Sequence, residues 1–291
     1  MAKILIAGAG RLGLPLALAL SGAGHEVAAI RRGEPRDAPG DIRWYRLDLR
    51  NPAALQVLDR DFDLVIVILT PAARSPEGYR QIYQEALDNL LGSLESSRGR
   101  PACLFVSATS VYAQNRGEWV DEESPTSPGT YNSMSLLSAE EAVLGWSPNP
   151  LVVRFAGIYG PDRMRLVRQL EKPLTIQRTP AAYTNRVHQE DCVGILRFLA
   201  GLQLGGRNSH RIYLGADHCP APKFEMMSWL ARTAGLPEPL PLDVAEDAPR
   251  NKRCSNRRLV EAGYRFSYPD YKSGYRAMLQ GGRPDPDGRP G

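Results

Sequence analysis

Residues 3–13 read Lys3-Ile4-Leu5-Ile6-Ala7-Gly8-Ala9-Gly10-Arg11-Leu12-Gly13, and an apolar run to Leu20 and the segment Val27-Ala28-Ala29-Ile30 follow. This order predicts strand, glycine turn, helix and strand. Gly8 permits a tight turn, Gly10 lets a pyrophosphate approach the backbone, and Gly13 lets the helix pack on the strand. The helix N-terminus favours bound phosphate through its free N–H groups and its dipole. We therefore expect a dinucleotide site at Gly8, Gly10, Arg11, Leu12 and Gly13; a glycine turn without ligand is the alternative.

The end of the second strand indicates which dinucleotide is bound. An acidic side chain there would bind the ribose hydroxyls of NAD, but this chain has Arg31 and Arg32. A pair of guanidinium groups suits the dianionic 2′-phosphate of NADP, and Arg11 could bind the same phosphate. The sequence therefore favours NADP(H) over NAD(H), with a solvated basic turn as the alternative.

Composition excludes several other classes of protein. The net charge of +4 over 291 residues is spread along the chain without a basic run beside aromatics, so no nucleic-acid partner is indicated. No apolar run reaches membrane-spanning length, so no membrane partner is expected. The four cysteines lack metal-ligand spacing and fit isolated thiols in a reducing compartment. We expect a cytoplasmic protein without a metal site.

Strands and helices alternate along the first half of the chain. Apolar segments at 42–47, 62–69, 102–106 and 151–155 predict strands, and 76–96 and 131–144 predict helices. This alternation predicts an α/β fold, a Rossmann-type doubly wound parallel sheet, with a smaller mixed α/β C-terminal lobe. We expect a nucleotide-binding domain at 1–161, a substrate-binding lobe at 162–280 and a disordered tail at 281–291.

Two strand ends in this arrangement point to the expected cofactor. Asp48 and Leu49 follow the third strand at the sheet edge where an adenine could be held. Thr70 follows the strand at 62–69 and would lie over the cofactor. These three residues complete the predicted nucleotide site, because ligands of such sheets bind at the carboxyl ends of the strands.

Four stretches give the chain a family resemblance: the glycine turn, Val106–Tyr112, Arg154–Pro161 and Asn185–Asp191. Together they resemble the extended short-chain dehydrogenases/reductases, the NAD-dependent epimerase/dehydratase family, and are most similar to its atypical, nucleoside-diphosphate-sugar epimerase-like branch. The resemblance implies an oxidoreductase or epimerase that acts on a carbonyl or secondary alcohol of a small molecule, such as a nucleotide sugar. It also implies a possible homodimer, formed through the helices at 76–96 and 131–144.

The resemblance also implies a catalytic set of Ser/Thr, Tyr and Lys, and this chain keeps one of the three. The tyrosine matches Tyr131, whereas the other two positions hold Ala108 and Ser135. A lysine at the position of Ser135 would lower the pKa of the tyrosine, which is about 10 in a free side chain. Thr109 and Ser110 are nearby hydroxyls that could replace the missing one. The losses leave open a second hypothesis: a catalytically impaired NADP(H)-binding sensor or regulatory protein.

Three arginines could bind an acidic substrate. Arg154, Arg163 and Arg186 lie in or near the two later stretches of the resemblance. Each could instead be a structural arginine, an interpretation that we favour for Arg154. His188 and Asp191 indicate a strand-to-helix connection rather than a catalytic dyad, because Asp191 lies near a predicted helix start.

Overall fold

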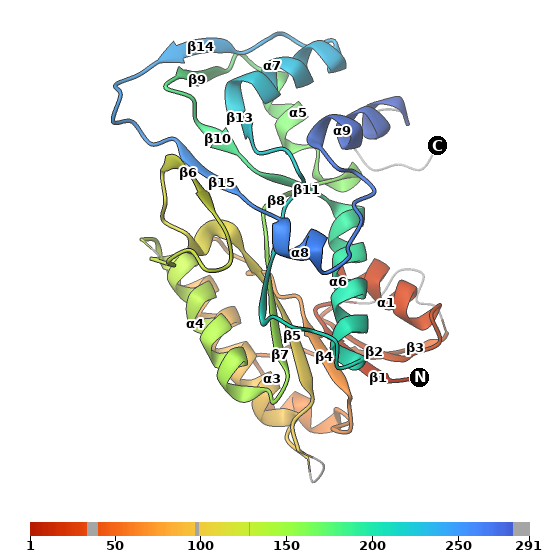
Figure 1. Ribbon diagram of the computed structural model, residues 1–291. Coiled ribbons are helices and arrows are strands. Elements are labelled where there is room, and N and C mark those ends of the chain that lie inside the picture. Colours follow the sequence, from red (N-terminus) through yellow and green to blue (C-terminus); the bar gives the residue numbers. More distant parts are fainter. Residues whose placement is uncertain (34–39, 97–98, 128, 282–291) are drawn as a thin grey trace. The chain divides into compact units, whose positions relative to one another are not determined.

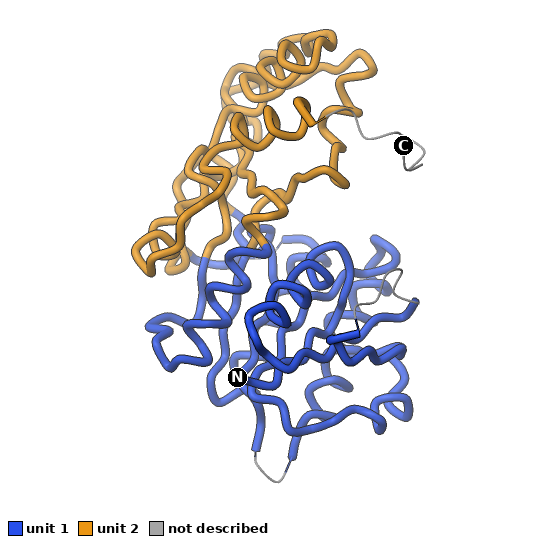
Figure 2. The backbone as a smooth tube through the Cα atoms, turned by 90° about the vertical axis from the view of Figure 1, so that its right-hand side faces the viewer, with its two compact units in different colours: residues 1–113, 125–154, 193–213 blue, residues 114–124, 155–192, 214–291 orange. Residues whose placement is uncertain are grey.

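The computed structural model of the protein describes residues 1–33, 40–96, 99–127 and 129–281. The chain forms two compact units, neither continuous in sequence (Figure 2). Unit 1 comprises residues 1–113, 125–154 and 193–213, and unit 2 comprises residues 114–124, 155–192 and 214–291. The expected domains at 1–161 and 162–280 remain a prediction. The expected disordered tail lies outside the described residues, apart from Gly281.

Unit 1 is built on a sheet of seven strands in the order β12-β7-β5-β4-β1-β2-β3 (Figure 1). The strands run parallel, which confirms the predicted doubly wound sheet. Its centre is apolar because β1 and β4 are covered on both faces; all four residues of β4 are buried. The strands are β1 (Lys3–Ala7), β2 (Glu26–Arg31), β3 (Ile42–Arg46), β4 (Leu64–Val67), β5 (Ala102–Ala108), β7 (Pro150–Phe155) and β12 (Ile212–Gly215).

Helices cover both faces of this sheet. Figure 1 shows α3 and α4 on one face and α1 and most of α6 on the other. The helix expected at 76–96 is an α-helix, a π-helical segment and a second α-helix in succession, begun by the Ser75 hydroxyl, which accepts from the Gly78 N–H at 3.1 Å. The helical segments are α1 (Gly13–Ser21), η1 (Pro52–Val57), α2 (Pro76–Arg80), η2 (Gln81–Ala86), α3 (Leu87–Ser93), η3 (Thr109–Val111), α4 (Tyr131–Trp146) and α6 (Gln189–Leu204).

Strand β12 belongs to the main sheet, although its residues fall within the range 162–280, which the sequence predicts to form the smaller lobe. The strand lies at the edge of the main sheet beside β7, where the Val152 N–H donates to the Arg211 carbonyl at 2.8 Å. Tyr213 and Leu214 are fully buried. The chain thus returns to the first sheet after a long excursion elsewhere, a long-range pairing that local sequence pattern does not reveal.

Unit 2 is built from short two-stranded ribbons and helices. Its ribbons pair β6 with β15, β8 with β11, β9 with β14 and β10 with β13. Its core contains Tyr159, Leu170, Met226, Leu230 and Tyr275. No helix within the described ranges is long and apolar enough to cross a membrane. The elements are β6 (Arg116–Val120), β8 (Gly157–Tyr159), η4 (Pro161–Arg163), α5 (Arg165–Leu170), β9 (Thr175–Thr179), β10 (Tyr183–Thr184), β11 (Arg186–His188), β13 (Ala221–Pro222), α7 (Lys223–Ala234), β14 (Leu240–Asp243), β15 (Asn251–Cys254), α8 (Arg257–Glu261) and α9 (Tyr271–Gln280).

A buried ion pair ties helix α4 to the sheet of unit 1. The Arg154 guanidinium on β7 binds the Glu140 carboxylate on α4, with Nη2 at 2.6 Å and Nε at 3.0 Å from its two oxygens. The remaining Arg154 nitrogen, Nη1, donates to the Tyr112 hydroxyl at 2.7 Å. The Ser107 hydroxyl donates to the same carboxylate at 2.5 Å. The four side chains satisfy one another, as a buried charge requires.

Replacing Glu140 by Ala should destabilise unit 1 by about 3–5 kcal/mol, because it leaves the Arg154 charge buried and unpaired. Glu141, its exposed neighbour on α4, gives the matched control, and Glu141→Ala should change stability little. Denaturant unfolding of the two variants measures the difference. Equal stabilities would contradict a structural role for this ion pair.

Candidate functional site

The glycine turn after β1 is held by close backbone contacts. The N–H groups of Gly8 and Ala9 both donate to the Ile30 carbonyl at the end of β2, at 3.2 and 2.9 Å. Gly8 has a φ of +107°, and a Cβ added there would lie 2.0 Å from the Ile68 carbonyl oxygen. Only glycine fits this position, because both the backbone angle and the space exclude a side chain.

The next two glycines differ in what surrounds them. A Cβ on Gly13 would lie 2.3 Å from the Gly8 carbonyl oxygen, so Gly13 is needed for α1 to pack at the turn. A Cβ on Gly10 would meet no atom within 4 Å. Protein packing therefore does not explain the glycine at position 10. Free space before the first turn of a helix suits a phosphate that approaches the backbone, so the residues present fit a dinucleotide.

The ends of β2 and β3 carry basic residues at neighbouring positions. Arg31 pairs in register with Arg46 on the neighbouring strand, and Arg32 follows directly. The acid beside them, Asp48, is bound by Arg50 through Nη2 at 2.6 Å and Nε at 3.1 Å. The hydrogen bonds from Arg50 lower the pKa of Asp48, and the charge of Arg32 acts in the same direction. Asp48 is therefore ionised and its charge is balanced within the protein.

The other predicted cofactor residues lie at the same edge of the sheet. Leu49 is buried, and its carbonyl accepts from the Asn89 amide at 3.1 Å. Thr70 is exposed three residues after the end of β4, and Arg11 is exposed within the glycine turn. Leu12 is buried as the residue that precedes α1. The order of strands in the sequence could predict that these residues lie at this edge of the sheet. The sequence did not predict the Asp48–Arg50 ion pair, although the two residues are close together along the chain.

Tyr131 is the first residue of α4 and is accessible to solvent. Its side chain is 41% exposed, in contrast to the buried tyrosines at positions 112 and 159. Its hydroxyl donates to the Arg74 carbonyl at 2.9 Å, and its ring meets the edge of Tyr79 at 5.5 Å between centroids. The ring contact and this hydrogen bond together fix the tyrosine, and its single hydroxyl hydrogen is engaged by the Arg74 carbonyl.

The other two positions of the catalytic set that the resemblance implies hold Ser135 and Ala108. The Ser135 hydroxyl donates to the Tyr131 carbonyl at 2.9 Å, one helical turn back. Ala108 ends β5, and Thr109 and Ser110 begin the short helix η3. Thr109 is half-buried and Ser110 is exposed, so both hydroxyls remain candidates.

The three candidate substrate arginines have different surroundings. Arg154 is 3% exposed, and its guanidinium is used by Glu140 and Tyr112. We therefore leave it out of the proposed substrate site. Arg163 is half-buried at the end of η4. Arg186 lies on β11 of unit 2 and makes no hydrogen bond or ion pair with any described residue through its buried Nε.

Asp191 and His188 form no dyad. The Asp191 carboxylate accepts from the Tyr264 hydroxyl at 2.9 Å and from the Ser267 and Tyr268 N–H groups at 2.8 and 2.9 Å. His188 ends β11, and its Nδ1 accepts from the Glu190 N–H at 3.3 Å. These contacts agree with the strand-to-helix connection expected from the sequence.

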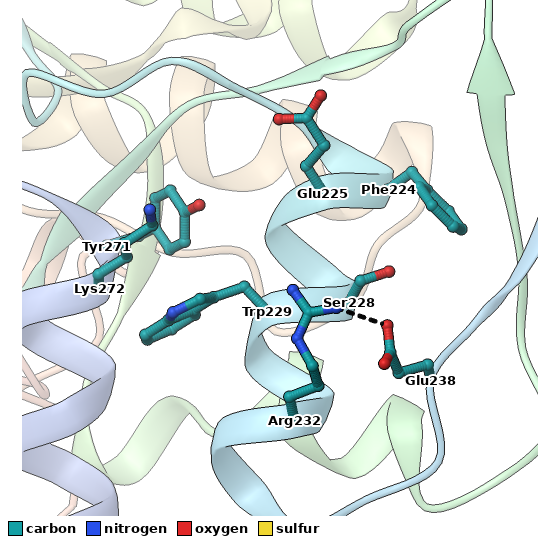
Figure 3. Close-up of a pocket in the computed structure, with 8 residues that line it drawn as sticks. All are labelled: Phe224, Glu225, Ser228, Trp229, Arg232, Glu238, Tyr271 and Lys272. Atoms are coloured by element: carbon teal, nitrogen blue, oxygen red, sulfur yellow. Dashed lines mark hydrogen bonds and ion pairs between the residues drawn. The ribbon is translucent and has the colours of Figure 1, made fainter.

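Unit 2 also contains a cavity of about 360 Å³ beside α7 (Figure 3). An ion pair between Arg232 and Glu238 at 2.9 Å borders it, and the Ser228 hydroxyl is buried there without a hydrogen-bond partner among the described residues. None of the predicted site residues is among its lining residues. The lining residues are Phe224, Glu225, Ser228, Trp229, Arg232, Glu238, Tyr271 and Lys272.

The parallel sheet and its glycine turn define the class: a Rossmann-type nucleotide-binding protein. The model of the NAD dependent epimerase/dehydratase family matches residues 4–197, which is more than half of the chain. The chain belongs to this family, as the sequence resemblance predicted.

Two curated relatives resemble almost the whole chain. Protein YeeZ of Escherichia coli (strain K12) is 31% identical over 283 residues, covering 93% of this chain and 97% of YeeZ. The 3-diazoavenalumate denitrifying reductase of a Streptomyces species is 24% identical over 307 residues, covering 94% of this chain and 98% of the reductase.

Solved structures give the same picture of the fold. A protein from Methylobacillus flagellatus, described as an NAD-dependent epimerase/dehydratase, has a TM-score of 0.80 and 33% identity, with 96% of this chain and 98% of that chain covered. The UDP-glucose 4-epimerase of Thermus thermophilus, solved with NAD, has a TM-score of 0.76 and 19% identity, with 96% and 98% covered. At that lower identity the likeness shows the fold alone.

The free space at Gly10 leads to a prediction with an internal control. Gly10→Ala should leave the melting temperature nearly unchanged and weaken dinucleotide binding by roughly tenfold or more, because a methyl group would fill the space that a phosphate needs. Gly8→Ala should instead lower the melting temperature strongly, since its Cβ would meet the Ile68 carbonyl. Thermal unfolding and a dinucleotide titration measure the two effects. Unchanged binding by Gly10→Ala would contradict the placement of the phosphates.

Proposed function

We propose that the protein is an NADP(H)-dependent oxidoreductase that reduces a carbonyl group of a small molecule. The observation that carries the proposal is the cluster of arginines at the ends of β2 and β3, beside a glycine turn with free space at Gly10. NADPH, when bound, supplies the hydride. The family and the reductase among the relatives support redox chemistry at this site.

The preference for NADP(H) follows from the charges at the adenosine end of the site. Arg31 and Arg32 would bind the 2′-phosphate, because a phosphate dianion gains charge-assisted hydrogen bonds from guanidinium groups. Asp48 does not oppose this binding, since Arg50 balances its charge. Gly8, Gly10 and Gly13 would receive the pyrophosphate, and Leu49 and Thr70 would border the rest of the cofactor.

The surviving tyrosine favours reduction over oxidation. Oxidation of an alcohol needs a tyrosinate that accepts a proton, and a neighbouring lysine normally favours that form. Ser135 stands at the lysine position and carries no charge. In the proposed reaction the Tyr131 hydroxyl exchanges its hydrogen bond to the Arg74 carbonyl for one to the carbonyl oxygen of the substrate and then donates its proton to that oxygen, which is the general-acid step of reduction. Thr109 or Ser110 would provide the second hydrogen bond to that oxygen.

The replacement of the expected Ser/Thr and Lys also supports a second function. Ala108 and Ser135 leave Tyr131 without its usual partners, and the Ser135 hydroxyl is bound to the backbone of its own helix. A protein that binds NADP(H) and reports its redox state to a partner would need the nucleotide site but no proton donor. Tight NADPH binding without turnover of any aldehyde, ketone or nucleotide sugar would favour this function over the enzyme.

Replacing Arg31 and Arg32 together by Ala should weaken NADPH binding by roughly tenfold or more and leave NADH binding within about twofold, because only NADPH carries the 2′-phosphate. Fluorescence titration with each nucleotide measures the selectivity. Arg60→Ala, an exposed arginine outside the predicted site, serves as the control. An equal loss for both nucleotides would contradict the assigned role of the pair.

Tyr131→Phe should lower kcat for carbonyl reduction by about 10²- to 10⁴-fold, the usual contribution of a general acid, while NADPH affinity stays the same. Tyr79→Phe is the matched control, because it removes a hydroxyl from the ring that packs on Tyr131. NADPH consumption over a panel of small aldehydes and ketones gives the rates. Equal turnover by wild type and Tyr131→Phe would exclude this mechanism.

The proposal also covers the cellular location of the protein and its oligomeric state. We place the protein in the cytoplasm, in agreement with four free cysteines, of which Cys103, Cys192 and Cys254 are buried. A homodimer formed through α4 and the helical run of α2, η2 and α3 remains a prediction, which a sedimentation measurement would test.

A further inference from the structure

The ribbon of β8 and β11 in unit 2 presents two residues of each strand on one face. Gly157 is the register partner of Arg186, and Tyr159 is the register partner of His188. Residues two apart on a strand point to the same face. Arg186 and His188 therefore project together, each beside its partner on β8.

Helix α9 covers the Tyr159 end of this face. Tyr275 stacks on Tyr159 with 4.5 Å between ring centroids and an angle of 15° between the rings. Gly274 permits this packing, because a Cβ there would lie 2.0 Å from the Tyr159 hydroxyl. Tyr159 and Tyr275 are almost completely buried, whereas Gly157 is exposed. The face is thus closed at one end and accessible at the end where Arg186 lies.

Arg186 fills the space that Gly157 leaves. A Cβ on Gly157 would lie 2.5 Å from Nη1 of Arg186, so the missing side chain makes room for the guanidinium. Arg186 is half-buried, its Nε is fully covered and unpartnered, and no ion pair or hydrogen bond joins its side chain to any other described residue. A positive charge held in this way lacks the partner that a desolvated guanidinium requires.

Neighbouring groups do not supply that partner. The Asp217 carboxyl is 2% exposed, and its Oδ1 accepts from the Cys219 N–H at 2.9 Å while its Oδ2 has no partner among the described residues. Burial raises the pKa of Asp217 to about 8, so this carboxyl is mostly uncharged at neutral pH. The Tyr275 hydroxyl is likewise buried without a partner in the described part of the chain. The charge of Arg186 is therefore not neutralised by Asp217, whereas that of Arg154 is balanced by Glu140.

We propose that Arg186 binds an anionic group of the substrate, a carboxylate or a phosphate, at the Gly157 end of this face. The planar guanidinium presents paired N–H donors that match either oxyanion. Its position is fixed by the strand and by the glycine beside it, so the donors are oriented before the ligand arrives. The term substrate rests on the proposed function, whereas the binding of an oxyanion by Arg186 does not.

The test measures binding of inorganic phosphate and of succinate to the protein without cofactor. All variants carry Arg31→Ala and Arg32→Ala, so that the arginines of unit 1 do not contribute. Arg186→Gln should weaken binding of the preferred anion by roughly tenfold or more, and Gly157→Ala should weaken it severalfold, because it displaces the guanidinium without removing its charge. Arg165→Gln removes an exposed charge that acts on Arg186 without removing a hydrogen-bond donor from the site, so it should weaken binding much less than Arg186→Gln.

The melting temperature of each variant gives a second measurement, which does not require a dissociation constant for a weakly bound anion. In low-salt buffer without either anion, Arg186→Gln should melt at the same or a higher temperature than its parent, because it removes an unpaired charge. In the presence of saturating anion, the parent should melt at a higher temperature than Arg186→Gln, because only the parent binds the anion through Arg186. Comparing phosphate with succinate shows which oxyanion the site prefers.

Loss of anion binding in Arg165→Gln equal to that in Arg186→Gln would overturn the proposal, since it would indicate general charge attraction. An absence of anion-dependent stabilisation in the parent would overturn it as well. Failure of the proposed function is separate: Tyr131→Phe could keep full turnover while Arg186 still binds the anion.

Discussion

The close approach of Gly8 to two strand ends is the constraint on which the rest of unit 1 depends. Its N–H reaches the Ile30 carbonyl at the end of β2, and its Cα lies against the Ile68 carbonyl after β4. A side chain at this position would separate the three central strands. The same turn directs α1 and leaves the space before its N-terminus free. Sheet geometry and nucleotide binding therefore share one set of contacts, which explains why local sequence could predict both.

The sequence predicted most of unit 1 because its signals are local. Each of these signals lies within a few residues of the feature that it predicts. They are the glycine turn, the β-branched run at 62–69 and the basic pair at 31–32. The sequence did not predict that β12 joins the main sheet, because β12 pairs with β7, which lies far from it along the chain. The Arg154–Glu140–Tyr112 cluster was only partly foreseen, as a structural arginine without its partners.

The residues proposed to act on the substrate are harder to predict from the sequence than the residues proposed to bind the nucleotide. A phosphate site is made largely by backbone N–H groups, so glycine positions specify it. A proton donor depends on side chains from several elements, and Ala108 and Ser135 stand at two positions of the catalytic set that the resemblance implies. The contact between the Tyr131 hydroxyl and the Arg74 carbonyl crosses 57 residues, and the unpaired state of Arg186 appears only when its strand partner is known. Neither leaves a pattern in the sequence.

The most direct test of the account is a fluorescence titration of the wild-type protein with NADPH and, separately, with NADH. The account predicts saturable binding of both at one site, with NADPH tighter by roughly tenfold or more, because arginines at the ends of β2 and β3 favour the 2′-phosphate. Equal affinity would contradict the assignment of NADP(H). No binding of either nucleotide would contradict the central claim that the Gly8–Gly13 turn holds a dinucleotide.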